Sequence, residues 1–325
     1  MSAPPNKPAP WANRLNKLLD QFHAVHGGDR FPVDVEALIR EVPATFQTGE
    51  PISIRGEVMD PEFEGALFNL NADAPGKGNW AIIYNQAISS PGRIRFTLAH
   101  ELGHYLVHRH LQTSFNCSEV DTTQWDSEER QIEFEANTFA SYLLMPADDF
   151  RRQIQGTAID LDVLGACADR YGVSMTSAIL KWLELTPQRA VLVMSQSGIV
   201  QWACGSESGK WLSMHLNKRL ANGQRRPLPA RSATRLGTDT NVDRLGTPID
   251  ASIWFPQEPE GMVAREMRIA SDFYRQTMTL LVLPPEVKPW ERDKMDDDDD
   301  GLENTFDRSE ERRVGEECRS GWWAV

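Results

Sequence analysis

The chain has 325 residues, of which 40% are hydrophobic and 25% charged, values that are ordinary for a globular protein with a sizeable core. Its formal net charge of −13 at pH 7 argues against a protein that holds nucleic acid through a broad basic surface. No apolar run approaches the roughly 18–20 residues that span a bilayer. The proline-rich start also lacks the apolar core of a signal peptide. We therefore expect a cytoplasmic protein without membrane contact.

Apolar residues at helical spacing predict two helices near the N-terminus, over residues 11–26 and 32–42. Three strand-like runs follow, separated by Gly, Pro, Asn and Asp, and they are residues 51–59, 65–70 and 79–85. Two further helices are expected, one beginning after Pro91–Gly92 and one over about 127–145 before Pro146, with a loop rich in Ser, Thr and Asp between them.

The second half of the chain changes from helical to strand-like periodicity. Residues 161–185 predict two helices around the turn at Gly172, whereas residues 189–204 predict a hairpin and residues 265–283 two more strands. Five consecutive aspartates at 296–300 repel one another and stay solvated. The four cysteines are widely spaced without a C-x-x-C pair, which indicates no disulfide framework or thiolate metal site. We expect two of them, Cys167 and Cys204, to be isolated buried thiols.

Residues 95–108 read RFTLAHELGHYLVH and contain an H-E-x-x-H pattern formed by His100, Glu101 and His104. On a helix, residues i and i+4 share one face, so both imidazoles can bind one ion. Glu101 is rotated by about 100° from the first histidine, beside the ion, where a base can take a proton from water. Because apolar residues flank the pattern, the helix is partly buried and its polar groups need partners. The pattern predicts Zn²⁺, which lowers the pKa of a bound water to roughly 7.

A catalytic zinc takes three protein ligands, so a third must lie elsewhere. His110 occupies the last position of H-E-x-x-H-x-x-G-x-x-H, but Val107 stands where that pattern needs Gly to turn the chain. On a continuing helix His110 would lie about 240° round from His104 and out of reach. We therefore expect His110, and also His108, at the surface.

A better third ligand is Glu133, in the segment IEFEANTFASYLLMP of residues 132–146. It shares one helical face with Asn137, which would accept the N–H of a ligand histidine one turn later. Small residues on that face would let the helix approach the motif helix opposite Gly103, where Gly costs about 1 kcal/mol relative to Ala. Glu135 is about 200° away and should face solvent. The other members of the shared face are Ala136, Ala140 and Leu144.

The transition-state oxyanion of a peptide hydrolysis needs a hydrogen-bond donor besides the metal. Tyr105, His108 and Tyr142 are candidate transition-state donors, and the sequence does not choose among them. Tyr105 and Tyr142 are equally suited to packing. An extended substrate would pair with an edge strand, for which residues 65–70 and 79–85 are the candidates.

The stretch FTLAHELGHYLVH, followed by E-x-E-A-N-x-F-A and LLMP, resembles the ImmA/IrrE family of metallo-endopeptidases over about residues 30–185. The resemblance implies a gluzincin-like site with His100, His104 and Glu133 as zinc ligands and Glu101 as general base, the residues that the face argument selects. It also implies that the substrate is a helix-turn-helix transcriptional repressor, whose cleavage relieves repression of stress-response genes or mobile elements.

These elements predict an α+β protein. Its zincin-like metalloprotease core consists of helices and a small mixed sheet, and a helix-turn-helix-like pair of helices follows. A small C-terminal α+β domain comes last, and we hypothesise a sensor-like role for it. Residues 308–318 resemble a translated sequencing adapter, so we expect residues 308–325 to be an artefact of sequence assembly and not part of the fold. The expected boundaries are 1–10 for a disordered N-terminus, 11–155 for the zinc metallopeptidase domain, 156–187 for the helix-turn-helix-like unit, 188–290 for the C-terminal domain and 291–325 for a disordered acidic tail.

Two other functions fit parts of the sequence. One is a non-catalytic, zinc-containing regulatory module that binds a repressor, but a purely structural site has no use for Glu101. The other is a DNA-binding regulator that uses residues 161–185. Its second helix carries only Lys181 as a cation and includes Glu184, so it would bind phosphate poorly. We therefore expect a protein substrate and no direct contact with nucleic acid.

Overall fold

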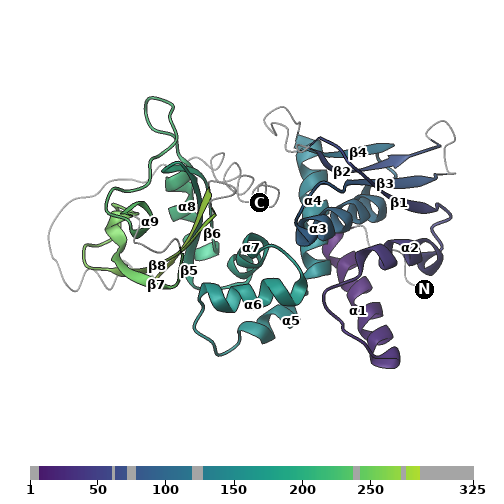
Figure 1. Cartoon of the computed structure of the whole chain (residues 1–325), viewed down its shortest axis with the longest axis horizontal. Coiled ribbons are helices and arrows are strands. Elements are labelled where there is room, and N and C mark those ends of the chain that lie inside the picture. The colour runs from purple at the N-terminus through teal and green to yellow at the C-terminus, as the bar shows by residue number, and fades with distance from the viewer. Residues whose placement is uncertain are drawn as a thin grey trace. The chain divides into compact units, whose positions relative to one another are not determined.

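The computed structural model describes residues 7–60, 63–71, 78–118, 127–236, 242–271 and 276–285. These described residues form two compact units, one within 7–157 and 165–181 and the other within 158–164 and 182–285 (Figure 1). Each unit combines helices with a sheet, which confirms the α+β class. The expected acidic tail, 291–325, lies outside the described residues.

Two helices open the first unit, as the periodicity predicts. Helix α1 (Pro8–His26) begins three residues before the predicted start, so residues 8–10 are helical although disorder was expected there. Helix α2 (Val35–Phe46) begins after Asp34, whose carboxylate accepts a hydrogen bond from the Ala37 N–H at 3.0 Å. That cap explains why α2 begins later than the pattern at 32–42 indicates.

A four-stranded mixed sheet follows, in the order β1-β3-β2-β4, with β1 parallel to β3 and the other pairs antiparallel. The strands are β1 (Ile52–Glu57), β2 (Phe63–Asn69), β3 (Trp80–Asn85) and β4 (Ser114–Ser118). Strand β4 lies where the sequence predicts only a loop. Because β2 and β3 are interior, the expectation that one of them is an edge strand was wrong, and the edges are β1 and β4.

Helix α3 (Pro91–Gly103) packs on one face of this sheet, against β2 and β3, and also against α4 (Ser127–Leu144) (Figure 1). Ser90 caps α3 by accepting a hydrogen bond from the Arg93 N–H at 3.3 Å. The chain continues from α3 without a break into η1 (His104–His108), a π-helical turn, a type that is rare and often occurs at functional sites. Pro146 ends α4 as predicted, and α5 (Ala147–Ile154) follows.

Helices α6 (Leu161–Tyr171) and α7 (Met175–Leu185) form the predicted pair, with Gly172 between them at φ 58°. Lys181, the cation that a groove-reading helix would need, is fully buried. Its Nζ lies 3.7 Å from the ring centroid of Tyr142 in α4. Lys181 is therefore inaccessible to phosphate, which argues against the DNA-binding alternative.

The second unit is built on a five-stranded antiparallel sheet in the order β6-β5-β9-β8-β7. Its core gathers apolar side chains such as Val193, Trp254 and Leu281. The predicted hairpin at 189–204 and the strand pair at 265–283 are both present. The elements are β5 (Arg189–Gln196), β6 (Ile199–Gly205), η3 (Glu207–Gly209), α8 (Lys210–Asn217), α9 (Ala233–Leu236), β7 (Val242–Asp250), η4 (Ala251–Ile253), β8 (Val263–Ser271) and β9 (Gln276–Leu283).

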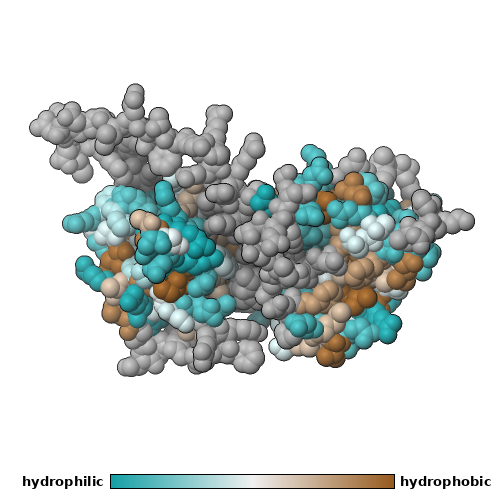
Figure 2. Space-filling model, turned by 90° about the horizontal axis from the view of Figure 1, so that it is seen from above, coloured by the Kyte–Doolittle hydropathy of each residue, from teal (hydrophilic) through white to brown (hydrophobic). Residues whose placement is uncertain are grey.

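On the face drawn in Figure 2, hydrophilic residues predominate and hydrophobic ones form small groups. In the described part of the chain, no helix combines the length and the apolar character needed to cross a membrane. Cys167 and Cys204 are buried thiols outside any disulfide, as predicted.

Candidate metal centre

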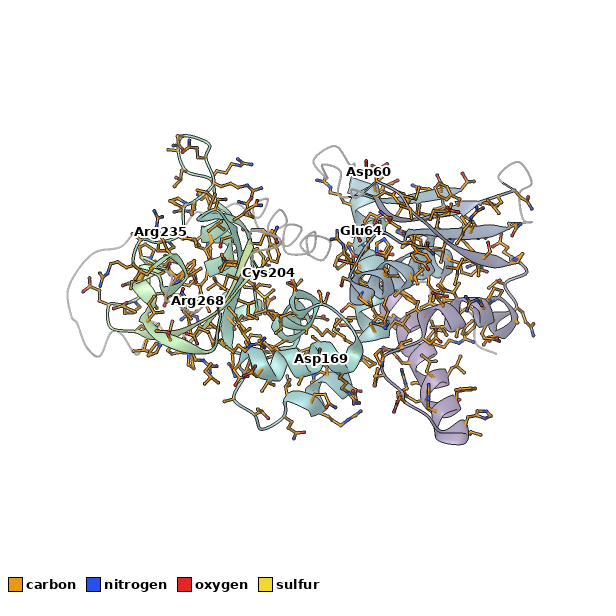
Figure 3. The ribbon with its side chains drawn as sticks, in the orientation of Figure 1. Asp60, Glu64, Asp169, Cys204, Arg235 and Arg268 are labelled. Atoms are coloured by element: carbon orange, nitrogen blue, oxygen red, sulfur yellow. The ribbon has the colours of Figure 1, made fainter. Side chains whose placement is uncertain are left out.

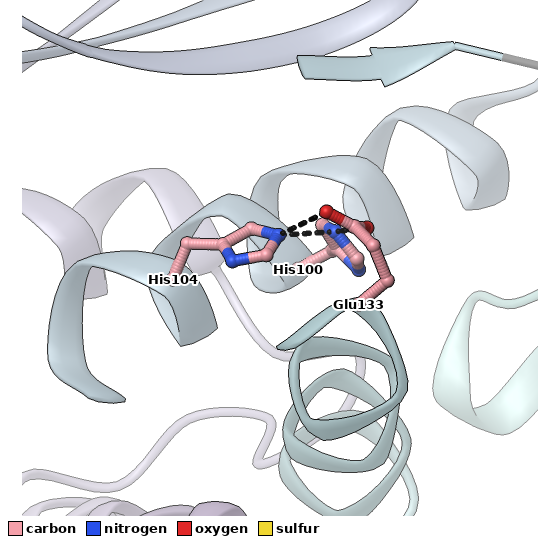
Figure 4. A group of neighbouring side chains, drawn as sticks. All are labelled: His100, His104 and Glu133. Carbon is pink, nitrogen blue, oxygen red and sulfur yellow. Dashed lines mark hydrogen bonds and ion pairs between the residues drawn. The ribbon is translucent and has the colours of Figure 1, made fainter. Parts of the chain in front are cut away.

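Three side chains from two helices converge on one point, as Figure 4 shows. The Nε2 atoms of His100 and His104 lie 2.8 Å apart. The Glu133 carboxylate lies 3.1 Å from His100 Nε2 through Oε2 and 3.3 Å from His104 Nε2 through Oε1. Both imidazoles are completely buried, and 13% of the Glu133 side chain is exposed. The structure thus brings together the three residues that the sequence selects as metal ligands.

The close approach of α3 and α4 depends on Gly103. A Cβ at this position would lie 3.0 Å from Cδ1 of Phe139 and 3.2 Å from its Cβ. The sequence predicts alanines opposite Gly103, but the ring of Phe139 fills this place. Ala136 and Ala140 are nevertheless fully buried on α4, so the predicted face is the inward one.

Asn137 orients the first histidine. Its Oδ1 lies 3.0 Å from His100 Nδ1, which is the contact that the helical spacing predicts. An amide oxygen only accepts hydrogen bonds, so Nδ1 of His100 carries a proton and donates it. Nε2 of His100 is then the atom that faces Glu133 and His104. Asn137 is 5% exposed, so water does not compete for this contact.

The charges of the cluster suit a divalent cation. Burial lowers the pKa of His104 to about 4, against the opposing effect of Glu133, so His104 is neutral at pH 7. Burial alone would raise the pKa of Glu133, but its electrostatic interaction with His104 and its side-chain contacts with both histidines lower it below its usual range. Burial also opposes protonation of His100, yet the hydrogen bond and charge of Glu133 raise its pKa. One carboxylate and two imidazole nitrogens form a His₂Glu set, which fits zinc.

Glu101 follows His100 in α3, and it is completely buried beneath β2. A Cβ on Gly65 of β2 would lie 3.6 Å from Glu101 Oε1 and 2.6 Å from Thr97 Cγ2. Its charge contributes to the raised pKa of His100, which places the carboxylate beside the cluster without making it a fourth member. A carboxylate in this position lies beside the cluster and is shielded from bulk water.

Glu64 ties β2 to α3 beside Gly65, and the sequence did not single it out. It lies between the sheet and the helices (Figure 3) and is 2% exposed. Its Oε1 accepts a hydrogen bond from Arg93 Nε at 2.7 Å, and its Oε2 accepts one from Thr97 Oγ1 at 3.2 Å. The signal available in the sequence is a charged residue inside the otherwise apolar strand FEGALF.

His108 is buried, with 2% exposure, so the expectation that it lies at the surface was wrong. Its Nδ1 lies 3.2 Å from His104 Nδ1, and its Nε2 lies 3.1 Å from Glu135 Oε2. Glu135, which was expected to face solvent, is only partly exposed, with 27% of its side chain accessible, because η1 runs alongside α4 on that flank. His110, beyond the π-helical turn, is exposed as predicted.

The two candidate tyrosines contact other parts of the fold. The Tyr105 hydroxyl is 2.8 Å from Thr48 Oγ1 and also donates to the Glu50 carbonyl, both in the segment between α2 and β1. The Tyr142 ring lies against Lys181 of α7. Of the three candidate donors, His108 is the one in direct contact with the cluster.

This arrangement is that of the H-E-x-x-H metalloprotease class. One helix carries His100, Glu101 and His104, a second helix carries Glu133, and a small mixed sheet packs against the first helix. Residues 61–182 match the family model of the IrrE N-terminal-like domain. The chain is 27% identical over 166 residues to the radiation response metalloprotease IrrE of Deinococcus radiodurans. That alignment covers 51% of this chain and 44% of the relative, so the chain matches less than half of the relative's length.

Proposed function

We propose that the protein is a zinc-dependent endopeptidase that cleaves a helix-turn-helix transcriptional repressor and thereby relieves repression. The observation that carries the proposal is the convergence of His100, His104 and Glu133 beside the buried Glu101. The relative from Deinococcus radiodurans is described as a radiation response metalloprotease, which supports both the reaction class and a role in a stress response.

Each residue of the site has a distinct role in this proposal. His100, His104 and Glu133 hold the zinc ion, and Asn137 keeps the ring of His100 turned toward it. A zinc ion in such a set supplies Lewis acidity, because it polarises a carbonyl and lowers the pKa of water to roughly 7. The Glu101 carboxylate takes a proton from the attacking water and delivers it to the leaving amine nitrogen.

Strand β4 is the docking edge that we infer for the substrate. It is an edge of the sheet, and the ring of its Phe115 stacks on His104 with centroids 4.5 Å apart and planes 17° apart. An extended peptide that pairs with β4 would therefore run past the metal cluster. The net charge of −13 would also attract the basic DNA-binding surface of a repressor.

The decisive experiment co-expresses the full chain with the repressor encoded nearest to its gene. We expect wild type to cleave the repressor and Glu101→Gln to lower kcat/KM by about 10²–10⁴-fold, the usual contribution of a general base. Glu129→Gln, an exposed acidic residue of α4, is the matched control and should cleave like wild type. Equal cleavage by wild type and Glu101→Gln would contradict the role of Glu101, and no cleavage by wild type would contradict this substrate.

A further inference from the structure

A line of polar side chains leads from the metal cluster through His104 to the flank of α4. His104 Nδ1 is 3.2 Å from His108 Nδ1, and His108 Nε2 is 3.1 Å from Glu135 Oε2. His104 is completely buried and His108 is 2% exposed, whereas 27% of the Glu135 side chain reaches solvent. The line thus begins in the interior and ends at the protein surface.

The direction of each hydrogen bond in this line follows from the chemistry of imidazole. A histidine that binds a metal through Nε2 keeps its single ring proton on Nδ1. His104 therefore donates from Nδ1, and His108 must accept at its own Nδ1. The proton of His108 then lies on Nε2, where the Glu135 carboxylate accepts it. Donors and acceptors alternate without conflict along the whole line.

The two ligand histidines have different outer partners. Asn137 holds His100 with an amide oxygen at 3.0 Å, whereas His104 depends on a second imidazole. The Phe115 ring stacks on His104 and restricts tilting of its plane, but an apolar ring cannot select a tautomer. The hydrogen bond to His108 is the contact that selects it.

We propose that His108 and Glu135 are positioning residues that hold His104 in the Nδ1-protonated form and so raise the affinity of the site for its metal. This inference rests on the metal site of the proposed function. Outer partners of this kind typically change metal affinity by 10–100-fold. Neither residue touches the substrate or the ion in this proposal.

A matched pair of substitutions at His108 separates hydrogen bonding from packing. Asn carries an Oδ1 in nearly the place of the imidazole Nδ1, so His108→Asn retains an acceptor for His104. His108→Leu has a similar shape and no acceptor. We expect His108→Leu to bind Zn²⁺ 10–100-fold more weakly than wild type and His108→Asn to stay close to wild type.

The measurements use the metal-free full chain. Competition with a chromophoric chelator gives the Zn²⁺ affinity, the absorption bands of bound Co²⁺ report ligand geometry, and thermal melting of the metal-free proteins reports folding. We expect the Co²⁺ bands to change in His108→Leu and not in His108→Asn. Equal affinities and bands in all three proteins would overturn the proposal, and so would an equal loss in both variants.

A second comparison applies if His108→Leu does not fold. Glu135→Ala removes the last acceptor from a partly exposed position, and Glu129→Ala removes an exposed acidic residue of the same helix. We expect weaker Zn²⁺ binding in Glu135→Ala alone, and equal binding in both would overturn the proposal. A wild type that binds no metal would overturn the proposed function together with this inference, whereas unchanged metal binding in the variants overturns only this inference.

Discussion

Gly103 of α3 lies directly against Phe139 of α4, so that a Cβ on Gly103 would come within 3.0 Å of the ring. This contact sets the separation between the helix that carries His100 and the helix that carries Glu133. Few real Cβ atoms have contacts this short, so a larger side chain at 103 must displace Phe139 or the helix behind it. The geometry of the metal cluster therefore depends on a residue outside it.

Gly103→Leu should separate the two helices and weaken the site. We expect the free energy of unfolding of the metal-free protein to fall by about 1–3 kcal/mol, the usual cost of overpacking. Zn²⁺ affinity should fall as well, because Glu133 moves away from the histidines. Urea unfolding and chelator competition measure the two effects. Adding Phe139→Ala should recover part of the Zn²⁺ affinity, and a double variant no better than Gly103→Leu would contradict this explanation.

Gly65→Ala tests the contact between β2 and the motif helix. The new Cβ would stand 2.6 Å from Thr97 Cγ2 and 3.2 Å from the Ile83 carbonyl oxygen, so the variant should lose about 1–3 kcal/mol of stability. Thr97→Ser removes that methyl group but keeps the hydroxyl that donates to Glu64. Urea unfolding of the double variant should therefore show a partial recovery. Equal stability of Gly65→Ala and wild type would mean that β2 does not press on α3.

The core of the candidate site was predictable because it depends on spacing within single helices. His100 and His104 share a face by helical geometry alone, and the same rule relates Glu133 to Asn137. The sequence could not show that α4 presents Phe139 to Gly103, because that depends on how one helix is rotated against the other. Periodicity indicates a buried face, but it does not identify which member of the face meets a given neighbour.

The features that the sequence missed depend on contacts between distant segments. Strand β4 lies in a Ser- and Thr-rich stretch whose apolar alternation is limited to Phe115 and Cys117, and its strand form requires pairing with β2. His108 and Glu135 come together because the π-helical turn keeps the chain beside α4. The spacing of His100, His104 and His108 at i, i+4 and i+8 was a visible signal that all three share one face.

The Asp149 carboxylate gives a pH-dependent contribution to stability. It accepts hydrogen bonds from Arg170 Nε at 2.9 Å and from the Tyr171 hydroxyl at 2.8 Å. Burial alone would raise the pKa of Asp149, but these bonds and one from Arg152 lower it. Because the pKa is lower in the folded than in the unfolded state, the stabilisation is complete above the unfolded value near 3.9 and is lost as the pH falls through the folded value.

Asp149→Asn should therefore reduce the free energy of unfolding by roughly 1.5–3 kcal/mol at pH 7, the range for hydrogen bonds to charged groups. The difference from wild type should shrink on acidification below about pH 4. Urea unfolding of the metal-free proteins at several pH values measures this difference. Asp148→Asn is the control, because 89% of that side chain is exposed. A difference that stays constant down to pH 2 would show that charge is not its source.

Zinc should stabilise the folded chain through Glu133. A ligand that binds only the folded state stabilises it by about 2.7 kcal/mol at a free concentration 100 times its Kd. We expect Zn²⁺ to raise the Tm of wild type and Glu129→Gln equally, and a chelator to reverse the increase. Glu133→Gln should show a much smaller increase, because a neutral amide is a poor zinc ligand and removes the only carboxylate among the three convergent side chains. An equal rise in Glu133→Gln would show that Zn²⁺ binds elsewhere, since the cluster without its carboxylate cannot hold the ion as tightly.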